Sequence, residues 1–173
     1  MDLKQLGREI IVTSYKEGEF TLSSGRSSTY IFDKYAFETR PKLLDAIAEG
    51  MGKMLNSDVS RIAGMELGGV PLATALSLKT GLPFVIVRKG KKGYGIDRSI
   101  EGDLITEDRV VIVEDIATTG AQALLVAEAV EEAGAKVSSI LYVVDREEGA
   151  REGIESKGYK FEALFTKSGL GVG

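Results

Sequence analysis

Short apolar runs alternate with longer stretches of helical spacing along this chain. The helical stretches, whose apolar residues recur with the helix period, cover residues 40–55, 70–81 and 121–134. The apolar runs are rich in Val and Ile and bounded by turn residues, as in buried strands of a parallel sheet; they cover residues 61–66, 82–89, 109–115 and 136–145. This alternation predicts βαβ crossovers and an α/β fold, in which helices flank a central, mostly parallel sheet.

Two segments lie outside this alternation. Residues 14–33 contain short aromatic runs interrupted by Gly18 and the polar cluster SSGRSS, which predicts a hairpin or a loop-rich appendage. Residues 88–103, RKGKKGYGIDRSIEGD, are rich in Gly, Lys and Arg and predict a cationic loop, here called the basic loop. Neither segment has the repeats or the composition of a linker, so we expect residues 1–173 to form one domain.

The composition narrows the possible chemistry. The chain has no Cys and no His, which excludes disulfides, thiolate nucleophiles, imidazole bases and the usual zinc sites. The net charge of -4 gives no overall attraction for nucleic acid. The N-terminus does not resemble a signal peptide, and no apolar run approaches the roughly 20 residues that span a bilayer. We therefore expect a cytoplasmic protein that binds neither nucleic acid nor membranes.

Residues 110–122, VVIVEDIATTGAQ, combine an apolar run, two acids and a Thr-Thr-Gly turn. We expect the strand to end near Glu114 and the next helix to begin near Gly120 or Ala121. The turn then lies at the carboxyl end of a parallel strand, where α/β sheets bind their ligands. Its backbone N–H groups at a helix N-terminus, together with the threonine hydroxyls, suit a phosphate.

Glu114 and Asp115 precede this turn although carboxylates repel a bare phosphate. They suit neutral hydroxyls, a cation or a developing positive charge beside the phosphate. A phosphorylated sugar with a cationic transition state at its anomeric carbon satisfies both groups. The alternative is an ordinary solvated turn with a threonine cap, but the order of strand, acid pair, turn and helix favours a ligand site.

These residues resemble the phosphoribosyl pyrophosphate (PRPP) signature of the type I phosphoribosyltransferases. Further matches point to the orotate phosphoribosyltransferases within that family, and they follow the order of the family along most of the chain: residues 20–33, 40–44, 68–77, 87–95, 100–104 and 143–152. The resemblance implies a type I phosphoribosyltransferase fold with a small N-terminal hood, contributed by about residues 1–35.

By this resemblance, one set of residues binds PRPP: Arg88, Lys89, Lys92, Tyr94, Glu114, Asp115, Ile116, Ala117, Thr118, Thr119, Gly120, Ala121 and Gln122. Lys92 and Asp115 are the implied catalytic residues, and in the family the basic loop closes over the partner's site in a homodimer. A leaving pyrophosphate must be neutralised and shielded from water, which agrees with a cationic loop. Solvated surface charge, the alternative, explains the lysines but not the glycines.

The resemblance also implies an orotate site formed by Thr118 and Arg146. A guanidinium can hold a carboxylate or an imide edge with two hydrogen bonds; a surface salt bridge with a neighbouring acid is the alternative. Hood residues 20–32 would cover the base, with Phe20, Tyr30 and Phe32 as candidate walls, although at least half of such aromatics are expected to be core.

Three positions depart from many bacterial members of the family. Those members have lysine at the positions of Ser23 and Gly68 and histidine at that of Tyr94. Two cationic contacts of the family are therefore missing from this chain, and the residues that could replace them are Arg26, Lys34 and Lys91.

The implied reaction is Mg²⁺-dependent transfer of 5-phosphoribose from PRPP to a ring nitrogen of orotate. It gives orotidine 5'-phosphate and pyrophosphate, in de novo pyrimidine (UMP) biosynthesis. Mg²⁺ is expected to be held mainly through the substrate, so no metal ligands are assigned to the protein. Two alternatives stay open: a phosphoribosyltransferase for a purine or uracil, and a non-catalytic PRPP-sensing regulator, which should carry an added DNA-binding motif or a basic face.

Overall fold

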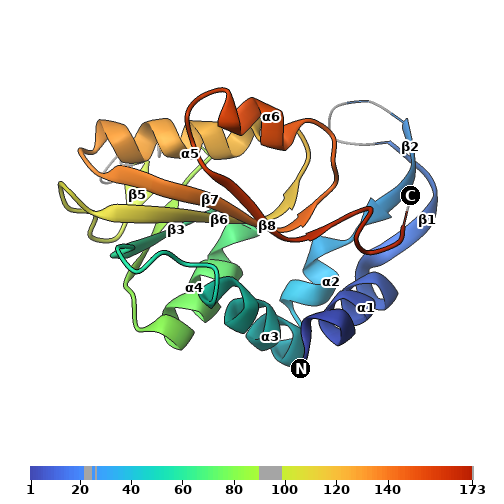
Figure 1. Ribbon diagram of the computed structural model, residues 1–173. Coiled ribbons are helices and arrows are strands. Elements are labelled where there is room, and N and C mark those ends of the chain that lie inside the picture. The colour runs from blue at the N-terminus through green and yellow to red at the C-terminus, as the bar shows by residue number, and fades with distance from the viewer. Residues whose placement is uncertain (22–24, 26, 90–98, 173) are drawn as a thin grey trace.

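The computed structural model describes residues 1–21, 25, 27–89 and 99–172. Its main sheet has the strand order β5-β4-β3-β6-β7-β8, and all strands except the edge strand β5 run parallel (Figure 1). The strands are β3 (Arg61–Met65), β4 (Phe84–Val87), β5 (Ile100–Glu101), β6 (Arg109–Ala117), β7 (Lys136–Asp145) and β8 (Phe161–Thr166). The predicted α/β class and the mostly parallel sheet are confirmed.

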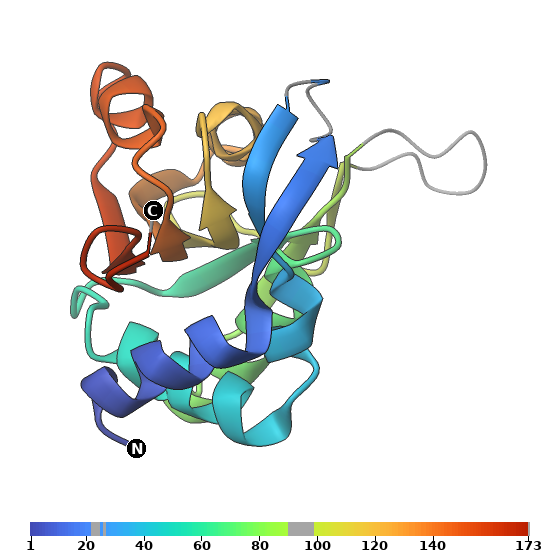
Figure 2. The same ribbon diagram turned by 90° about the vertical axis from the view of Figure 1, so that its right-hand side faces the viewer.

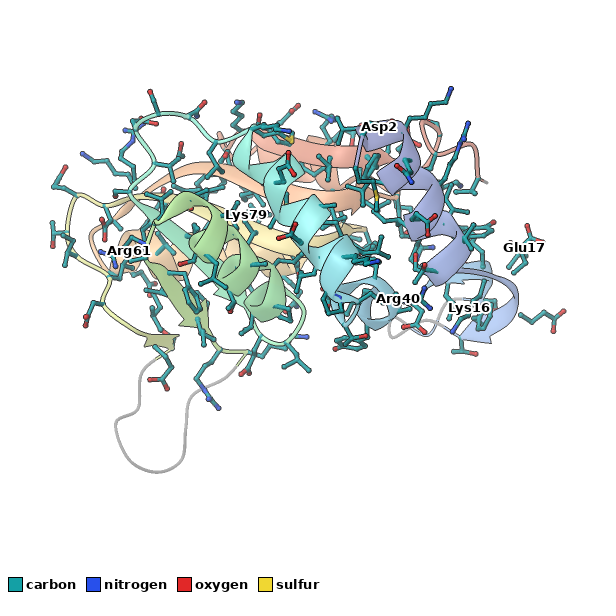
Figure 3. All side chains as sticks on the ribbon, turned by 90° about the horizontal axis from the view of Figure 1, so that it is seen from below. Asp2, Lys16, Glu17, Arg40, Arg61 and Lys79 are labelled. Carbon is teal, nitrogen blue, oxygen red and sulfur yellow. The ribbon has the colours of Figure 1, made fainter. Side chains whose placement is uncertain are left out.

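Helices cover both faces of this sheet (Figures 1 and 2). On one face lie α5 (Ala121–Glu132) and α6 (Ala150–Glu155), and on the other lie α3 (Pro41–Gly52) and α4 (Gly69–Thr80), which pack side by side (Figure 3). Helices α1 (Leu3–Ser14) and α2 (Lys34–Glu38) pack against α3 and against each other. Among the described residues, no helix is long and apolar enough to cross a membrane.

The position of β6 at the centre of the sheet explains why its sequence is continuously apolar. Val111 and Val113 belong to the core beneath α3 and α4, whereas Val110 and Ile112 belong to the core beneath α5. All four side chains are fully buried, and burying one such side chain contributes roughly 1.5–3 kcal/mol. A strand covered on both faces has no polar positions to alternate with apolar ones, so the sequence shows a run.

The N-terminal hood contains the predicted hairpin. Strands β1 (Tyr15–Thr21) and β2 (Ser27–Phe32) pair antiparallel and form a separate two-stranded sheet. The hairpin is attached to the body where the Asp33 N–H donates to the Ser14 carbonyl oxygen, at 2.7 Å. Viewed from the side, it rises from α1 and α2 at the end of the sheet that carries the β6–α5 turn (Figure 2).

Several elements differ from the sequence expectations. Strand β6 runs to Ala117, three residues beyond its expected end at Glu114, because Ile116 and Ala117 still pair with β7. Helix α5 begins at Ala121, as predicted. Five elements were not anticipated: α1, α2, β5, α6 and β8. Of these, β5 lies within residues 88–103, which were expected to form only a loop. Helices α2 and α6 have five and six residues, too few to display a helical period.

Candidate active site

The carboxyl ends of β6 and β7 bring the two predicted ligand segments together. Ala117 and Asp145 are register partners on these neighbouring parallel strands, and the N–H of Arg146 donates to the Ala117 carbonyl oxygen at 3.0 Å. Thr118 follows Ala117 directly, so it begins the β6–α5 turn beside Arg146. The structure therefore places Thr118 and Arg146, the predicted orotate residues, at one edge of the sheet.

The turn after β6 has the shape expected of a phosphate site. Gly120 caps α5 with a φ of 74°, in the left-handed region that favours glycine. The first N–H groups of a helix have no partner within the helix and point outward, so the start of α5 offers donors to an anion. Thr119, Ala121 and Gln122 are exposed around this turn, which leaves them accessible to a ligand.

The remaining residues of the PRPP segment lie within β6. The Ala117 side chain is buried in the core beneath α5, and the Ile116 side chain packs against the opposite core. The Ala117 side chain is therefore closed to a ligand, whereas Ile116 is half-buried. The PRPP role of both residues stays a prediction. Glu114 and Asp115, in contrast, are the acids at the open end of the strand.

Asp115 is held on both of its oxygens although only 3% of the residue is exposed. Oδ2 accepts from Lys34 Nζ at 2.9 Å, and Oδ1 accepts from the Ile116 N–H at 2.7 Å. Burial by itself favours the neutral amine of Lys34, but the attraction of Asp115 outweighs it and raises the pKa of Lys34. Lys34, one of the three cations considered as replacements, therefore does reach the site.

Two further carboxyl groups surround this ion pair. Burial and, after it, the nearby Asp115 charge raise the pKa of Glu114 to about 7 and that of Glu38 to about 8. Glu38 is 3% exposed, and a hydrogen bond from its protonated carboxyl group to Asp115 also raises its pKa. Sequence reasoning missed Glu38 because α2 is too short to show a helical period and because Glu38 and Asp115 lie far apart in the sequence.

Arg146 lies in the site and already forms an ion pair with an acid. It is 7% exposed, and its Nη2 contacts Glu148 Oε1 at 2.8 Å. Its guanidinium also lies 4.6 Å from the centroid of the Tyr30 ring, and Nε donates to the Tyr30 hydroxyl at 3.3 Å. The salt bridge that was the alternative reading is therefore present, but it occurs inside the site, where a planar anion can compete for the same guanidinium.

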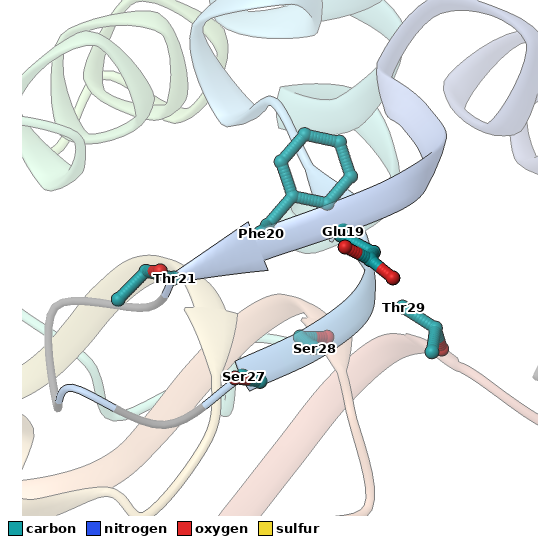
Figure 4. Close-up of a pocket in the computed structure, with 6 residues that line it drawn as sticks. All are labelled: Glu19, Phe20, Thr21, Ser27, Ser28 and Thr29. Atoms are coloured by element: carbon teal, nitrogen blue, oxygen red, sulfur yellow. The ribbon is translucent and has the colours of Figure 1, made fainter.

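The three candidate wall residues of the hood have different positions. Phe32 is buried in the core beneath α3 and α4, whereas Tyr30 reaches Arg146 from β2. Phe20 lines a hollow on the hairpin together with Glu19, Thr21, Ser27, Ser28 and Thr29 (Figure 4). Tyr30 is thus the hood aromatic that the structure connects to the predicted base site.

The start of the basic loop lies two strands away from β6. Arg88 and Lys89 follow β4, and the Lys89 N–H donates to Glu66 Oε1 at 2.8 Å, which joins it to the segment between β3 and α4. The positive charge of Lys89 acts on Glu114, where it lowers the pKa against the stronger effects of burial and Asp115. Other predicted positions lie outside the described residues: Ser23, Arg26, Lys91, Lys92 and Tyr94.

The described part of the site has oxygen atoms for a substrate-borne cation but no cluster of side chains that would enclose a metal ion. Within the described ranges, no three side chains of His, Cys, Asp or Glu lie close enough to hold a metal ion among themselves. Glu114 and Asp115 supply the hard oxygen atoms that suit sugar hydroxyls and the surroundings of a Mg²⁺ ion bound to phosphates.

This arrangement matches a known class of enzyme. The family model of the phosphoribosyl transferase domain matches residues 36–160, which include β3 to β7, the β6–α5 turn and Arg146. The fold and the site thus define a phosphoribosyltransferase domain.

The most similar relatives narrow the class. The orotate phosphoribosyltransferase of Methanocella arvoryzae is 46% identical over 97% of this chain and 93% of its own length. That of Thermococcus gammatolerans is 50% identical over 88% and 82%. A crystal structure of Mycobacterium tuberculosis orotate phosphoribosyltransferase in complex with PRPP has a TM-score of 0.83 and 32% identity, and the match covers 99% of this chain and all of that one. The chain belongs to the orotate phosphoribosyltransferase family.

Proposed function

We propose that the protein transfers the 5-phosphoribosyl group of PRPP to orotate, giving orotidine 5'-phosphate and pyrophosphate in de novo pyrimidine (UMP) synthesis. One observation carries the proposal: a helix-start phosphate turn, a buried carboxylate and a guanidinium meet at the ends of the neighbouring strands β6 and β7. Each suits a different part of the two substrates. The names of the relatives agree with this reaction.

The residues have separate tasks in this reaction. The turn at residues 118–120 binds the 5-phosphate, Glu114 and Asp115 bind the ribose hydroxyls, and Arg146 with Thr118 orients orotate beneath Tyr30. Because the orotate nitrogen can lose its proton without a strong enzymic base, positioning and charge stabilisation suffice in a chain without His. Asp115 and Glu114 stabilise the positive charge that develops at the anomeric carbon.

Mg²⁺ is the expected cofactor. When bound, Mg²⁺ would supply positive charge to offset the negative charge of the leaving pyrophosphate. The protein would hold it indirectly, through the substrate atoms that Glu114, Asp115 and the basic loop contact. We also expect a single domain, a homodimer in which the basic loop serves the partner's site, no binding of nucleic acid or membranes, and a cytoplasmic location.

The test is a turnover assay with each candidate base. The loss of orotate absorbance is followed with PRPP and Mg²⁺, and the same assay is run with uracil, adenine and hypoxanthine. We expect turnover of orotate that needs Mg²⁺ and falls by at least about a hundredfold in Asp115→Asn and Lys92→Ala. Turnover of a purine alone would refute the assignment. Binding of a promoter fragment without any turnover would favour a PRPP-sensing regulator.

A further inference from the structure

Lys34 and Glu38 lie on one face of α2 and both approach Asp115. They are four positions apart, which puts them one helical turn from each other. Lys34 Nζ lies 2.9 Å from Asp115 Oδ2, and the charge of Asp115 acts directly on the Glu38 carboxyl group. Phe37 is fully buried beside them and fixes α2 against the body. Helix α2 thus holds the Lys34 ammonium group in a fixed position beside the Asp115 carboxylate.

Gly68 lies on the other side of this contact. A Cβ atom at position 68 would overlap Asp115 Oδ2, and it would lie 2.9 Å from Asp115 Cγ and 3.1 Å from Glu38 Oε1. Its backbone is in the ordinary right-handed region, with φ of -65° and ψ of -34°, so the conformation itself does not call for glycine. Glycine is needed at position 68 because the Asp115 carboxylate occupies the space that a side chain would take.

We propose that Lys34 is a positioning residue for PRPP binding: it holds Asp115 toward the ribose site and offsets part of its charge, and Gly68 provides the room for this contact. The inference rests on the proposed function. It assigns a role to two residues outside the PRPP motif, on α2 and at the start of α4.

Electrostatics explains why the acid needs such a partner. Asp115, Glu114 and Glu38 are three carboxyl groups in one poorly solvated region, and PRPP brings a 5-phosphate and a pyrophosphate to the same place. A buried carboxylate without a partner is costly and would also repel these phosphates. Lys34 lowers the pKa of both Glu38 and Glu114 against the larger effects that raise them, which shows that its charge reaches all three acids.

The test measures PRPP binding in matched lysine variants by titration calorimetry, with turnover of orotate recorded alongside. Lys34→Met should weaken PRPP binding by about tenfold or more, while the KM for orotate stays unchanged. Lys34→Arg keeps the charge and should remain within about threefold of wild type. The control is Lys53→Met, which removes the lysine of an exposed pair with Glu49 and should change neither quantity.

A double-mutant cycle tests whether Lys34 acts through Asp115. In an Asp115→Asn background, Lys34→Met should have little further effect on PRPP affinity, because the charge that it neutralises is gone. An undiminished tenfold loss in that background would overturn the positioning role in favour of direct phosphate contact. Wild-type PRPP affinity in Lys34→Met would overturn the whole inference.

Gly68→Ala probes the same contact without touching a charge. Its Cβ would displace Asp115 from Lys34, so PRPP binding should weaken as in Lys34→Met, and this variant decides the question if Lys34→Met does not fold. Unchanged affinity in Gly68→Ala would contradict the inference. If the wild-type protein turns over orotate and these variants bind PRPP as tightly as wild type, the role of Lys34 is refuted and the proposed function stands. An inactive wild-type protein would refute the proposed function.

Discussion

At the scale of single residues, the proposed orotate site contains an acid that would compete with the substrate. Arg146 is held by Tyr30 through its ring and its hydroxyl and by the Glu148 carboxylate at 2.8 Å. The Tyr30 hydroxyl also donates to the same Glu148 oxygen at 3.3 Å. Orotate carries a carboxylate of its own, so substrate and Glu148 compete for the same guanidinium.

Glu148→Gln should therefore tighten orotate binding. We expect the KM for orotate to fall by about three- to tenfold with little change in kcat, because a neutral amide competes less well for the guanidinium. Steady-state kinetics at saturating PRPP measure this. Glu155→Gln, in the exposed pair with Arg151, is the control. A rise in KM of similar size would mean instead that Glu148 orients Arg146 for the substrate.

Glu38 should make stability depend on pH. Its pKa rises from the usual 4.5 to about 8 in the folded protein because of burial and the Asp115 charge. Between these pH values the folded state binds more protons than the unfolded chain, so the free energy of unfolding falls as pH rises. Glu114, with a pKa of about 7, acts in the same direction. Both groups resist ionising beside Asp115.

Urea unfolding at pH 5, 7 and 9 tests this dependence. Wild type should lose on the order of 4 kcal/mol between pH 5 and pH 9 through Glu38, and Glu38→Gln should remove that part of the loss. Glu128→Gln, which changes an exposed residue of α5, should leave the pH profile as it is. If Glu38→Gln and wild type gave parallel profiles, the proton would not reside on Glu38.

At the scale of elements, the sequence predicts helices and strands that are long enough to show a period. It does not predict features that depend on contacts between residues far apart in the chain. The central strands and α3, α4 and α5 have enough residues to show their period, and the β6–α5 turn follows from local chemistry. The end of β6 does not follow from local chemistry, because pairing of Ala117 with Asp145 extends the strand. The Lys34–Asp115 pair joins residues 81 positions apart, so the sequence offered Lys34 only as one of three possible cations.

The β6–α5 turn should tolerate no side chain at Gly120. Its φ of 74° strains any other residue, and an added Cβ would also lie 2.9 Å from two atoms of the Ile154 side chain. Gly158 has a φ of 87° with nothing within 4 Å of an added Cβ, so Gly158→Ala isolates the backbone effect. We expect Gly158→Ala to cost about 1 kcal/mol and Gly120→Ala about 2–4 kcal/mol.

Urea unfolding gives both values, and PRPP titration gives the functional effect. Only Gly120→Ala should weaken PRPP binding, since Gly158 lies outside the site. Equal losses of stability in the two variants would show that Ile154 moves aside without cost.

At the scale of the whole molecule, an acidic chain has to attract a highly charged anion. The net charge is -4, so attraction must come from local arrangement rather than from the overall charge. Around Asp115 the acids are offset by Lys34 and by protons on Glu38 and Glu114, and Arg88, Lys89 and Arg146 lie at the ends of β4 and β7. Arg88 and Lys89 begin the basic loop, which also contains Lys91, Lys92 and Arg98 and whose proposed place is in the partner's site.

Mixed dimers test whether the basic loop serves the partner. Lys92→Ala and Asp115→Asn are each expected to be inactive alone. If Lys92 of one subunit acts beside Asp115 of the other, each mixed dimer contains one intact site and one doubly altered site. Random reassociation of equal amounts should then restore about a quarter of wild-type activity. A loop that served its own subunit would give almost no recovery, and the two variants combined without subunit exchange provide the baseline.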